Sequence, residues 1–246
     1  MIIQKYIDFN DCYYRFNKWV LLHPSQGEID GCQLQLPSII IECDSIKADE
    51  IDLGKVGYKK AKWKSLLRSY VDMDKLDLFY EGLTKVTGNS YSFDFKSKSN
   101  GNGGCIKSLV VTRRGRKKSK WTELHVMWRT CQLETKFAGD LIMISRVIQD
   151  APNCDIKHIV FHIPQAYMSA MYVSYLVEGV FNLPLESFKP QDHKFYERIR
   201  SYDKWKDSSY RLCKRASVAK YQLHYHNLKK GLYEPVRLPD CTLTRN

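Results

Sequence analysis

Several short segments of the chain alternate between apolar and polar residues, a two-residue period that is typical of β-strands with one buried face. This pattern predicts strands over residues 33–43, where it passes into an apolar run, and 89–95, and further β-like stretches predict strands over 107–112, 122–128 and 156–163. The strands over 107–112 and 122–128 flank a polar, basic run, so together they predict an antiparallel hairpin.

Other segments repeat their apolar residues every three to four positions, as a helix with one buried face does. They predict helices over 57–86, 140–151 and 165–181. Pro152 and the sequence "NLP" at 182–184 are expected to end the second and third helices. Because 246 residues suffice for one sizeable core, the sequence predicts a single α/β or α+β domain spanning 1–246.

The residues from about 190 onward are basic, aromatic and poorly periodic, and we expect them to form an extension of the domain. No apolar run reaches the roughly 18 residues that cross a bilayer, and the first residues, "MIIQKYIDFNDCYY", lack the pattern of a secretory signal. The eight cysteines are scattered, without a CxxC pair or close Cys/His spacing. These features predict a soluble, cytoplasmic protein with free thiols, no membrane partner and no structural metal site.

The chain carries a formal net charge of +12, with 39 Lys and Arg against 27 Asp and Glu. This excess favours a phosphate-bearing partner, whether a nucleotide, a nucleic acid or an anionic lipid. The densest basic run, "RRGRKKSK" at 113–120, is interpreted either as the solvated tip of the hairpin or as a nucleic-acid contact.

Cys105 follows the flexible segment "NGNGG" and begins the first hairpin strand. A cysteine there is either inert packing or a nucleophile, and a nearby cation would favour the nucleophile by stabilising the thiolate. With the hairpin turn near 115–119, Arg129 at the end of the partner strand lies roughly opposite Cys105. We therefore expect the thiol and the guanidinium to share one pocket.

Four motifs follow one another between residues 103 and 170: "GGCIKSLVV", "LHVMWRT", "KFAGDL" and "IVFHIPQAYMS". In this order they resemble the catalytic half of the thymidylate synthase and deoxycytidylate hydroxymethylase superfamily, most closely its phage-type hydroxymethylase branch. The resemblance covers roughly residues 36–178. It implies an α+β fold, an α/β sandwich in which helices flank a mixed β-sheet, and a homodimer that pairs through a face of that sheet.

The resemblance also implies roles for individual residues. Cys105 matches the family's nucleophile, and Arg129 with Thr130 matches the Arg-Ser pair that holds the nucleotide phosphate. Asp140 stands eleven residues beyond the arginine, at the position that contacts the pyrimidine edge. Further substrate-binding positions of the family correspond here to Tyr91, Gln132, Tyr167 and Ser169.

Two interpretations of Asp140 stay open. The family's uracil-specific enzymes have asparagine here, whereas a carboxyl can accept a hydrogen bond from the cytosine amine and hold a proton for N3. Asp140 therefore favours a cytosine nucleotide. Alternatively, it caps a helix that begins near Leu141, a position at which aspartate is common.

Some positions differ from the family's pattern. Gln132 stands where relatives have an aspartate that helps to bind the folate and the base, and Lys136 replaces a glycine. The family's glutamate that organises water and protons is matched by lysine in "YKKAKWK", which leaves Glu42 and Glu50 as alternative substitutes.

The resemblance implies an enzyme, a folate-dependent one-carbon transferase that acts on C5 of a pyrimidine deoxynucleotide monophosphate with 5,10-methylenetetrahydrofolate as cofactor. Addition of the Cys105 thiolate to C6 would make C5 nucleophilic. The hydroxymethylase branch predicts hydroxymethylation of dCMP for modified phage DNA. Alternatives are methylation or hydroxymethylation of dUMP, the same scaffold acting on nucleic acid, and a non-catalytic nucleotide or nucleic-acid binder.

Overall fold

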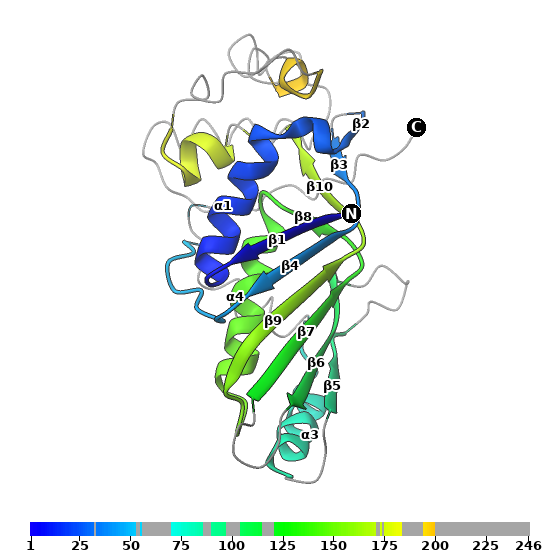
Figure 1. Cartoon of the computed structure of the whole chain (residues 1–246), viewed down its shortest axis with the longest axis vertical. Coiled ribbons are helices and arrows are strands. Elements are labelled where there is room, and N and C mark those ends of the chain that lie inside the picture. The colour runs from blue at the N-terminus through cyan, green and yellow to red at the C-terminus, as the bar shows by residue number, and fades with distance from the viewer. Residues whose placement is uncertain are drawn as a thin grey trace.

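The computed structural model describes residues 1–31, 33–52, 55, 70–85, 90–96, 104–114, 121–170, 173, 175–183 and 194–199. Much of the first predicted helix, the tip of the hairpin and most of the basic extension lie outside these residues. The described chain has an α+β fold, with a large mixed sheet flanked by helices and a smaller second sheet (Figure 1). The predicted α+β class is confirmed.

The large sheet contains six strands in the spatial order β1-β4-β9-β7-β6-β5. The strands, in that order, are β1 (Ile2–Tyr6), β4 (Ile39–Cys43), β9 (Ile156–Ile163), β7 (Trp121–Trp128), β6 (Ile106–Arg114) and β5 (Ser90–Asp94). The pairs β1–β4 and β7–β9 are parallel, and the other neighbours are antiparallel. The predicted strands over 89–95 and 156–163 and the predicted hairpin are confirmed.

The smaller sheet contains four strands in the order β2-β3-β10-β8. These are β2 (Glu28–Asp30), β3 (Gln33–Leu36), β10 (Ala166–Ser169) and β8 (Cys131–Gln132). Three of them continue central strands of the large sheet after a break of two residues: β3 leads into β4, β7 into β8, and β9 into β10. The two sheets therefore meet along a seam, which we define as residues 37–38, 129–130 and 164–165. Pro37 and Pro164 suit these breaks, because proline has no N–H for a strand ladder.

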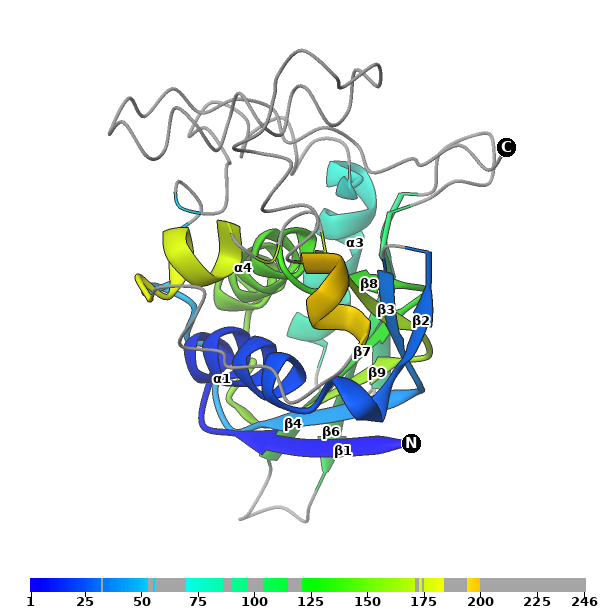
Figure 2. The same ribbon diagram turned by 90° about the horizontal axis from the view of Figure 1, so that it is seen from above.

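Two helices lie on one face of the large sheet: α1 (Phe9–Leu22) and α4 (Lys136–Gln149) (Figure 2). Asp8 caps α1, because its carboxylate accepts a hydrogen bond from the backbone N–H of Asp11 at 2.8 Å. An aromatic core joins helix to sheet: the ring of Phe161 lies 5.2 Å from that of Phe9 and 4.9 Å from that of Trp128, centroid to centroid. None of the described helices is long and apolar enough to cross a membrane.

A third helix, α3 (Met73–Thr84), lies at the other end of the large sheet, beside β5 (Figure 1). Its buried face is formed by Leu76, Phe79 and Leu83, and the Phe79 ring lies 5.8 Å from that of Phe93 on β5. The described fold also contains a 3-10 turn η1 (Pro24–Gln26), a π-helix η2 (Tyr175–Val180) and a short helical segment at 194–199.

Three predicted elements are corrected by the structure. The strand expected over 33–43 is divided at Pro37 into β3 and β4, which belong to different sheets. The helix expected over 165–181 begins instead as strand β10, because Ala166–Ser169 pairs with both β3 and β8. The helix expected over 57–86 does not run through residues 71–72; its described part is α3, and residues 56–69 lie outside the described residues.

Candidate active site

Cys105 and Arg129 are paired at the seam. The backbone N–H of Arg129 donates a hydrogen bond to the carbonyl oxygen of Cys105 at 2.8 Å, directly beyond the pair formed by Ile106 and Trp128. The Cys105 side chain is buried and the Arg129 side chain is exposed. The predicted pairing of Cys105 with Arg129 is confirmed, and it brings a permanent positive charge close to the thiol.

The surroundings of Cys105 determine its protonation. Burial and the charge of Asp140 raise the pKa of the Cys105 thiol to about 11. Lys136, Arg129 and a hydrogen bond with the Thr130 side chain act in the opposite direction, but burial outweighs them. The thiol is therefore protonated at neutral pH in the free protein, and a nucleophilic role requires that the proton leave when substrate binds.

Asp140 is the fifth residue of α4, and its carboxyl group is buried, with the residue only 2% exposed. The helix begins at Lys136 rather than near Leu141, and Thr135 occupies the N-cap position, so the interpretation of Asp140 as a helix cap is wrong. The indole Nε1–H of Trp128 donates to Asp140 Oδ2 at 3.2 Å. Burial raises the pKa of Asp140 to about 7, although Trp128 and Lys136 lower it. At neutral pH this carboxyl can both donate and accept hydrogen bonds.

A second buried acid, Glu134, lies between β8 and α4 and is not singled out by any sequence motif. Its Oε1 accepts hydrogen bonds from the side-chain Nε2 of Gln132 at 2.8 Å and from the backbone N–H of Ser169 at 3.2 Å. Burial raises the pKa of Glu134 to about 7, against the effect of these two hydrogen bonds and of Lys136. Within the described part of the chain, Glu134 Oε2 and Ser169 Oγ are buried without a hydrogen-bond partner. The predicted residues Gln132 and Ser169 thus meet at an acid that the sequence did not reveal.

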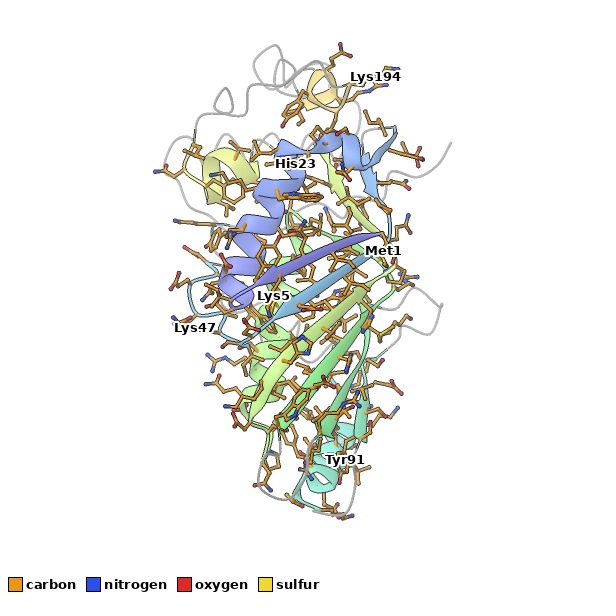
Figure 3. All side chains as sticks on the ribbon, in the orientation of Figure 1. Met1, Lys5, His23, Lys47, Tyr91 and Lys194 are labelled. Carbon is orange, nitrogen blue, oxygen red and sulfur yellow. The ribbon has the colours of Figure 1, made fainter. Side chains whose placement is uncertain are left out.

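Tyr167 belongs to this group, and Tyr91 does not. Tyr167 is half-buried and pairs with Gln132 in the parallel β10–β8 ladder. Tyr91 pairs with Val111, five residues along β6 from Ile106, which is roughly 17 Å at the usual rise of a strand. Its hydroxyl donates to the carbonyl oxygen of Lys85 at 2.8 Å. Figure 3 accordingly shows Tyr91 at the α3 end of the molecule, away from the seam.

An aromatic ring lies against the backbone just before Cys105. A Cβ atom added to Gly104 would come within 2.0 Å of Cε1 of Tyr70, so a larger residue cannot be accommodated unless the ring moves. The backbone of Tyr70 is held by the N–H of Lys96, which donates to its carbonyl oxygen at 2.7 Å. Tyr70 is therefore a further residue of the candidate site, and in the sequence it stands out only as an apolar position with helical spacing.

The two glutamates considered as substitutes for the family's proton-organising residue lie elsewhere. Glu42 lies on the face of the large sheet opposite α1 and α4, with its Oε2 3.5 Å from Nε2 of His158. Glu50 is exposed, and its backbone N–H donates to Oδ1 of Asn10 at 3.0 Å. The acid that the structure places beside the predicted substrate-binding residues is Glu134.

The first two arginines of the basic run at 113–120 make contacts within the chain. Arg114 Nε donates to Oε2 of Glu123 at 2.7 Å. The guanidinium of Arg113 donates to the backbone carbonyls of Lys85, at 2.9 Å, and of Leu83, and it lies over the ring of Tyr91. Residues 115–120 lie outside the described residues, so a nucleic-acid contact by this run stays a prediction.

The polar groups at the seam suit an organic ligand. Among the described residues, no three His, Cys, Asp or Glu side chains are arranged to hold a metal ion. Gln132, Glu134 and Ser169 instead present an amide and two buried oxygens that lack partners in the described chain. Such groups fit the amino and ring N–H donors of a pyrimidine or of a pterin such as that of a folate.

Comparison of the chain with models of protein families gave no match, and a search of curated proteins gave none either. The resemblance to the thymidylate synthase superfamily therefore rests on the four sequence motifs.

Proposed function

We propose that this chain is a folate-dependent one-carbon transferase that hydroxymethylates C5 of deoxycytidylate. The main support is that Arg129, Thr130 and Asp140 all act on Cys105, which lies beside the seam. These are the residues to which the resemblance assigns the nucleophile, the phosphate contact and recognition of the base. A buried carboxyl with a pKa of about 7 suits cytosine, because it can hold a proton for N3 and accept from the 4-amino group.

Each residue has its own task in this mechanism. Arg129 and the Thr130 hydroxyl bind the phosphate through charge-assisted hydrogen bonds. The Cys105 thiol first loses its proton to solvent, and the thiolate sulfur then forms a bond to C6. The C5=C6 electron pair moves to C4–C5, the C4=N3 pair moves to N3 and Asp140 donates its proton to N3, which makes C5 nucleophilic. Lys136 and Arg129 stabilise the thiolate that attacks. Bound 5,10-methylenetetrahydrofolate would supply the one-carbon unit, and Gln132, which is hydrogen-bonded to Glu134, would offer it a hydrogen-bonding group.

The proposal extends to assembly and location. The face of the large sheet opposite α1 and α4 carries Trp121 and Met127 on β7, which alternate with the buried Trp128 and are 37% and 38% exposed. The same face carries Ile3 on β1, which is 60% exposed. We propose that a second copy of the chain covers this face. A cytoplasmic location agrees with the five cysteines of the described chain, all of which are free thiols.

The test is release of tritium from C5-labelled nucleotides by the purified protein in the presence of methylenetetrahydrofolate. We expect release from dCMP in preference to dUMP. The Cys105→Ser variant should release no tritium, while its circular dichroism spectrum should match that of the wild-type protein. Asp140→Asn should move the preference towards dUMP by about ten- to hundredfold, because one hydrogen-bond pair is then mismatched. Absence of release from both nucleotides by the wild-type protein would overturn the proposal.

The protonated thiol favours a second candidate, a nucleotide-binding protein without chemistry. A pKa of about 11 leaves little thiolate at neutral pH. In this case calorimetry would detect dCMP binding that Arg129→Ala weakens and Cys105→Ser leaves unchanged, while no tritium is released.

A further inference from the structure

The side-chain amide of Gln132 is held in one orientation. An amide carries a donating NH2 group at one end and an accepting oxygen at the other. Gln132 Nε2 donates to Oε1 of Glu134 at 2.8 Å, and the same oxygen accepts from the backbone N–H of Ser169, so Oε1 is an acceptor and the NH2 end of the amide faces Glu134. The carbonyl oxygen of Gln132 consequently lies on the side away from Glu134.

Glu134 is itself anchored from three elements. The backbone N–H of Ser169 on β10 donates to the same Oε1 at 3.2 Å, and Gln132 on β8 donates to it as described. The Tyr13 hydroxyl on α1 donates to the backbone carbonyl oxygen of Glu134 at 3.2 Å. With the residue fully buried, its carboxyl has little freedom to turn, so it can fix a neighbour in place.

We propose that Glu134 is a positioning residue that locks the Gln132 amide and so presents the Gln132 carbonyl oxygen as an acceptor to an amino or ring N–H group of the bound ligand. The nature of that ligand, a pyrimidine nucleotide or a folate, rests on the proposed function. The orientation of the Gln132 amide does not rest on the proposed function, because it is set by contacts within the free protein.

The protonation state of Glu134 controls how firmly the Gln132 amide is held. Glu134 Oε2 has no hydrogen-bond partner in the described chain, so it can take up a proton without displacing the donors on Oε1. Protonation weakens the hold on Gln132, because hydrogen bonds to an ionised acceptor are about twice as strong as those to a neutral one. The titratable groups near Glu134 in the described part are Lys136 on α4, Cys131 on β8 and Tyr13 on α1. Of these, only Lys136 carries a charge that favours the ionised form of Glu134.

The first experiment needs no ligand. The side-chain NH2 resonances of Gln132 are assigned by their loss in Gln132→Met, and their chemical shift and exchange rate are followed with pH. We expect slow exchange with solvent and a titration near pH 7 that disappears in Glu134→Gln. Resonances like those of an exposed glutamine, or a titration that persists in Glu134→Gln, would overturn the proposal. Because the wild-type titration alone is informative, an unstable variant would not block the test.

The second experiment separates positioning from a purely structural role. Glu134→Gln should raise the KM for the ligand that contacts Gln132 about tenfold, with kcat changed by less than about twofold. In the Gln132→Met background the same change should have no further effect on KM. Additive effects in this cycle would show that Glu134 acts on ligand binding independently of Gln132, and an unchanged KM in both backgrounds would assign Glu134 to stability alone; either result would overturn the proposal. Failure of the wild-type protein to release tritium would contradict the proposed function, whereas the amide titration would still decide the role of Glu134.

Discussion

Glu123 and Glu134 are both buried acids of this chain, yet the protein treats them in opposite ways. Burial raises the pKa of Glu123, but the hydrogen bond and charge of Arg114, together with His158 and His125, outweigh burial and hold it below its usual value. Glu134 receives its hydrogen bonds from uncharged donors, Gln132 and the Ser169 backbone, and its pKa is raised to about 7. The difference comes from the charged partner of Glu123 and from the more complete burial of Glu134.

Glu123 is part of a row of charged and titratable side chains that crosses four strands on the open face of the large sheet. Arg114 on β6 contacts Glu123 on β7 at 2.7 Å, Nδ1 of His158 on β9 lies 3.5 Å from Glu123 Oε1, and Glu42 on β4 continues the row. Such a row joins neighbouring strands, and Arg114 compensates the charge of Glu123. It is a structural feature of the sheet.

The seam between the sheets shows the opposite arrangement. Asp140 and Glu134 are buried there with Lys136 as a nearby cation, and burial dominates the pKa of both. Ionisation of these acids at neutral pH costs stability, and such a cost is commonly found where acids take part in binding or proton transfer. This contrast indicates that the functional site lies beside the seam rather than on the sheet face that carries the row of charged side chains.

The largest expected effect is a change in the free energy of unfolding in the Asp140→Asn variant. The rise of the pKa from the usual 3.8 to about 7 corresponds to about 4 kcal/mol, at about 1.4 kcal/mol per pKa unit. The folded protein keeps this proton to a higher pH than the unfolded chain, so stability falls as pH rises from about 4 to about 7. Asn has no proton to lose and should be more stable than wild type by up to about 4 kcal/mol in urea unfolding at pH 8.5, and nearly equal to it near pH 4. A gain of the same size at both pH values would contradict the raised pKa.

Glu134→Gln should behave in the same way with a smaller amplitude. Its pKa rises from 4.5 to about 7, which corresponds to about 3 kcal/mol of stability gained by the variant above pH 7 and little gained near pH 4.5. The glutamine oxygen can still accept from Gln132 and Ser169. The control is Glu50→Gln, which removes an exposed carboxylate and should change stability little at either pH. A loss of stability in Glu134→Gln at neutral pH would show that the carboxylate is stabilising, as in Glu123.

Much of this contrast could not be predicted from the sequence. Short β-like stretches bounded by polar or turn residues identified the strand over 156–163 and the hairpin, and counting from the hairpin turn paired Cys105 with Arg129. "AYMS" at 166–169 is an apolar run that fits a buried helix as well as a strand, and its partners β3 and β8 lie far away in sequence. The burial of Glu134 follows from the continuation of three strands into the second sheet, a long-range feature that no local pattern encodes.

The Glu123→Gln variant should change stability in the opposite direction at neutral pH, so that it is less stable than the wild-type protein. Loss of a charge-assisted hydrogen bond at a side chain that is 11% exposed should destabilise the protein by about 1 kcal/mol, since the exposed Arg114 can be hydrated instead. Because the folded pKa of Glu123 is lowered, this stability is present above its usual pKa and is lost as pH falls through the lower, folded value. Urea unfolding between pH 3 and pH 7 should therefore show wild type and variant converging in acid. A variant more stable than wild type at pH 7 would place Glu123 in the same class as Glu134.

The smallest expected effect concerns the cation at the seam. Lys136 lowers the pKa of Cys105, Glu134 and Asp140, so Lys136→Gln should raise all three. Two unit charges roughly 6 Å apart in water interact by about 0.7 kcal/mol, which corresponds to about a threefold change in the thiolate fraction. Alkylation of Cys105 by iodoacetamide at pH 8, followed by mass spectrometry of the Cys105 peptide, should therefore slow about threefold, because the thiolate is the reactive form. Lys5→Gln is the matched control, since Lys5 is exposed on β1 and pairs with Asp44 at 3.5 Å (Figure 3). An unchanged rate in Lys136→Gln would leave Arg129 and Thr130 as the groups that oppose the effect of burial on the thiol.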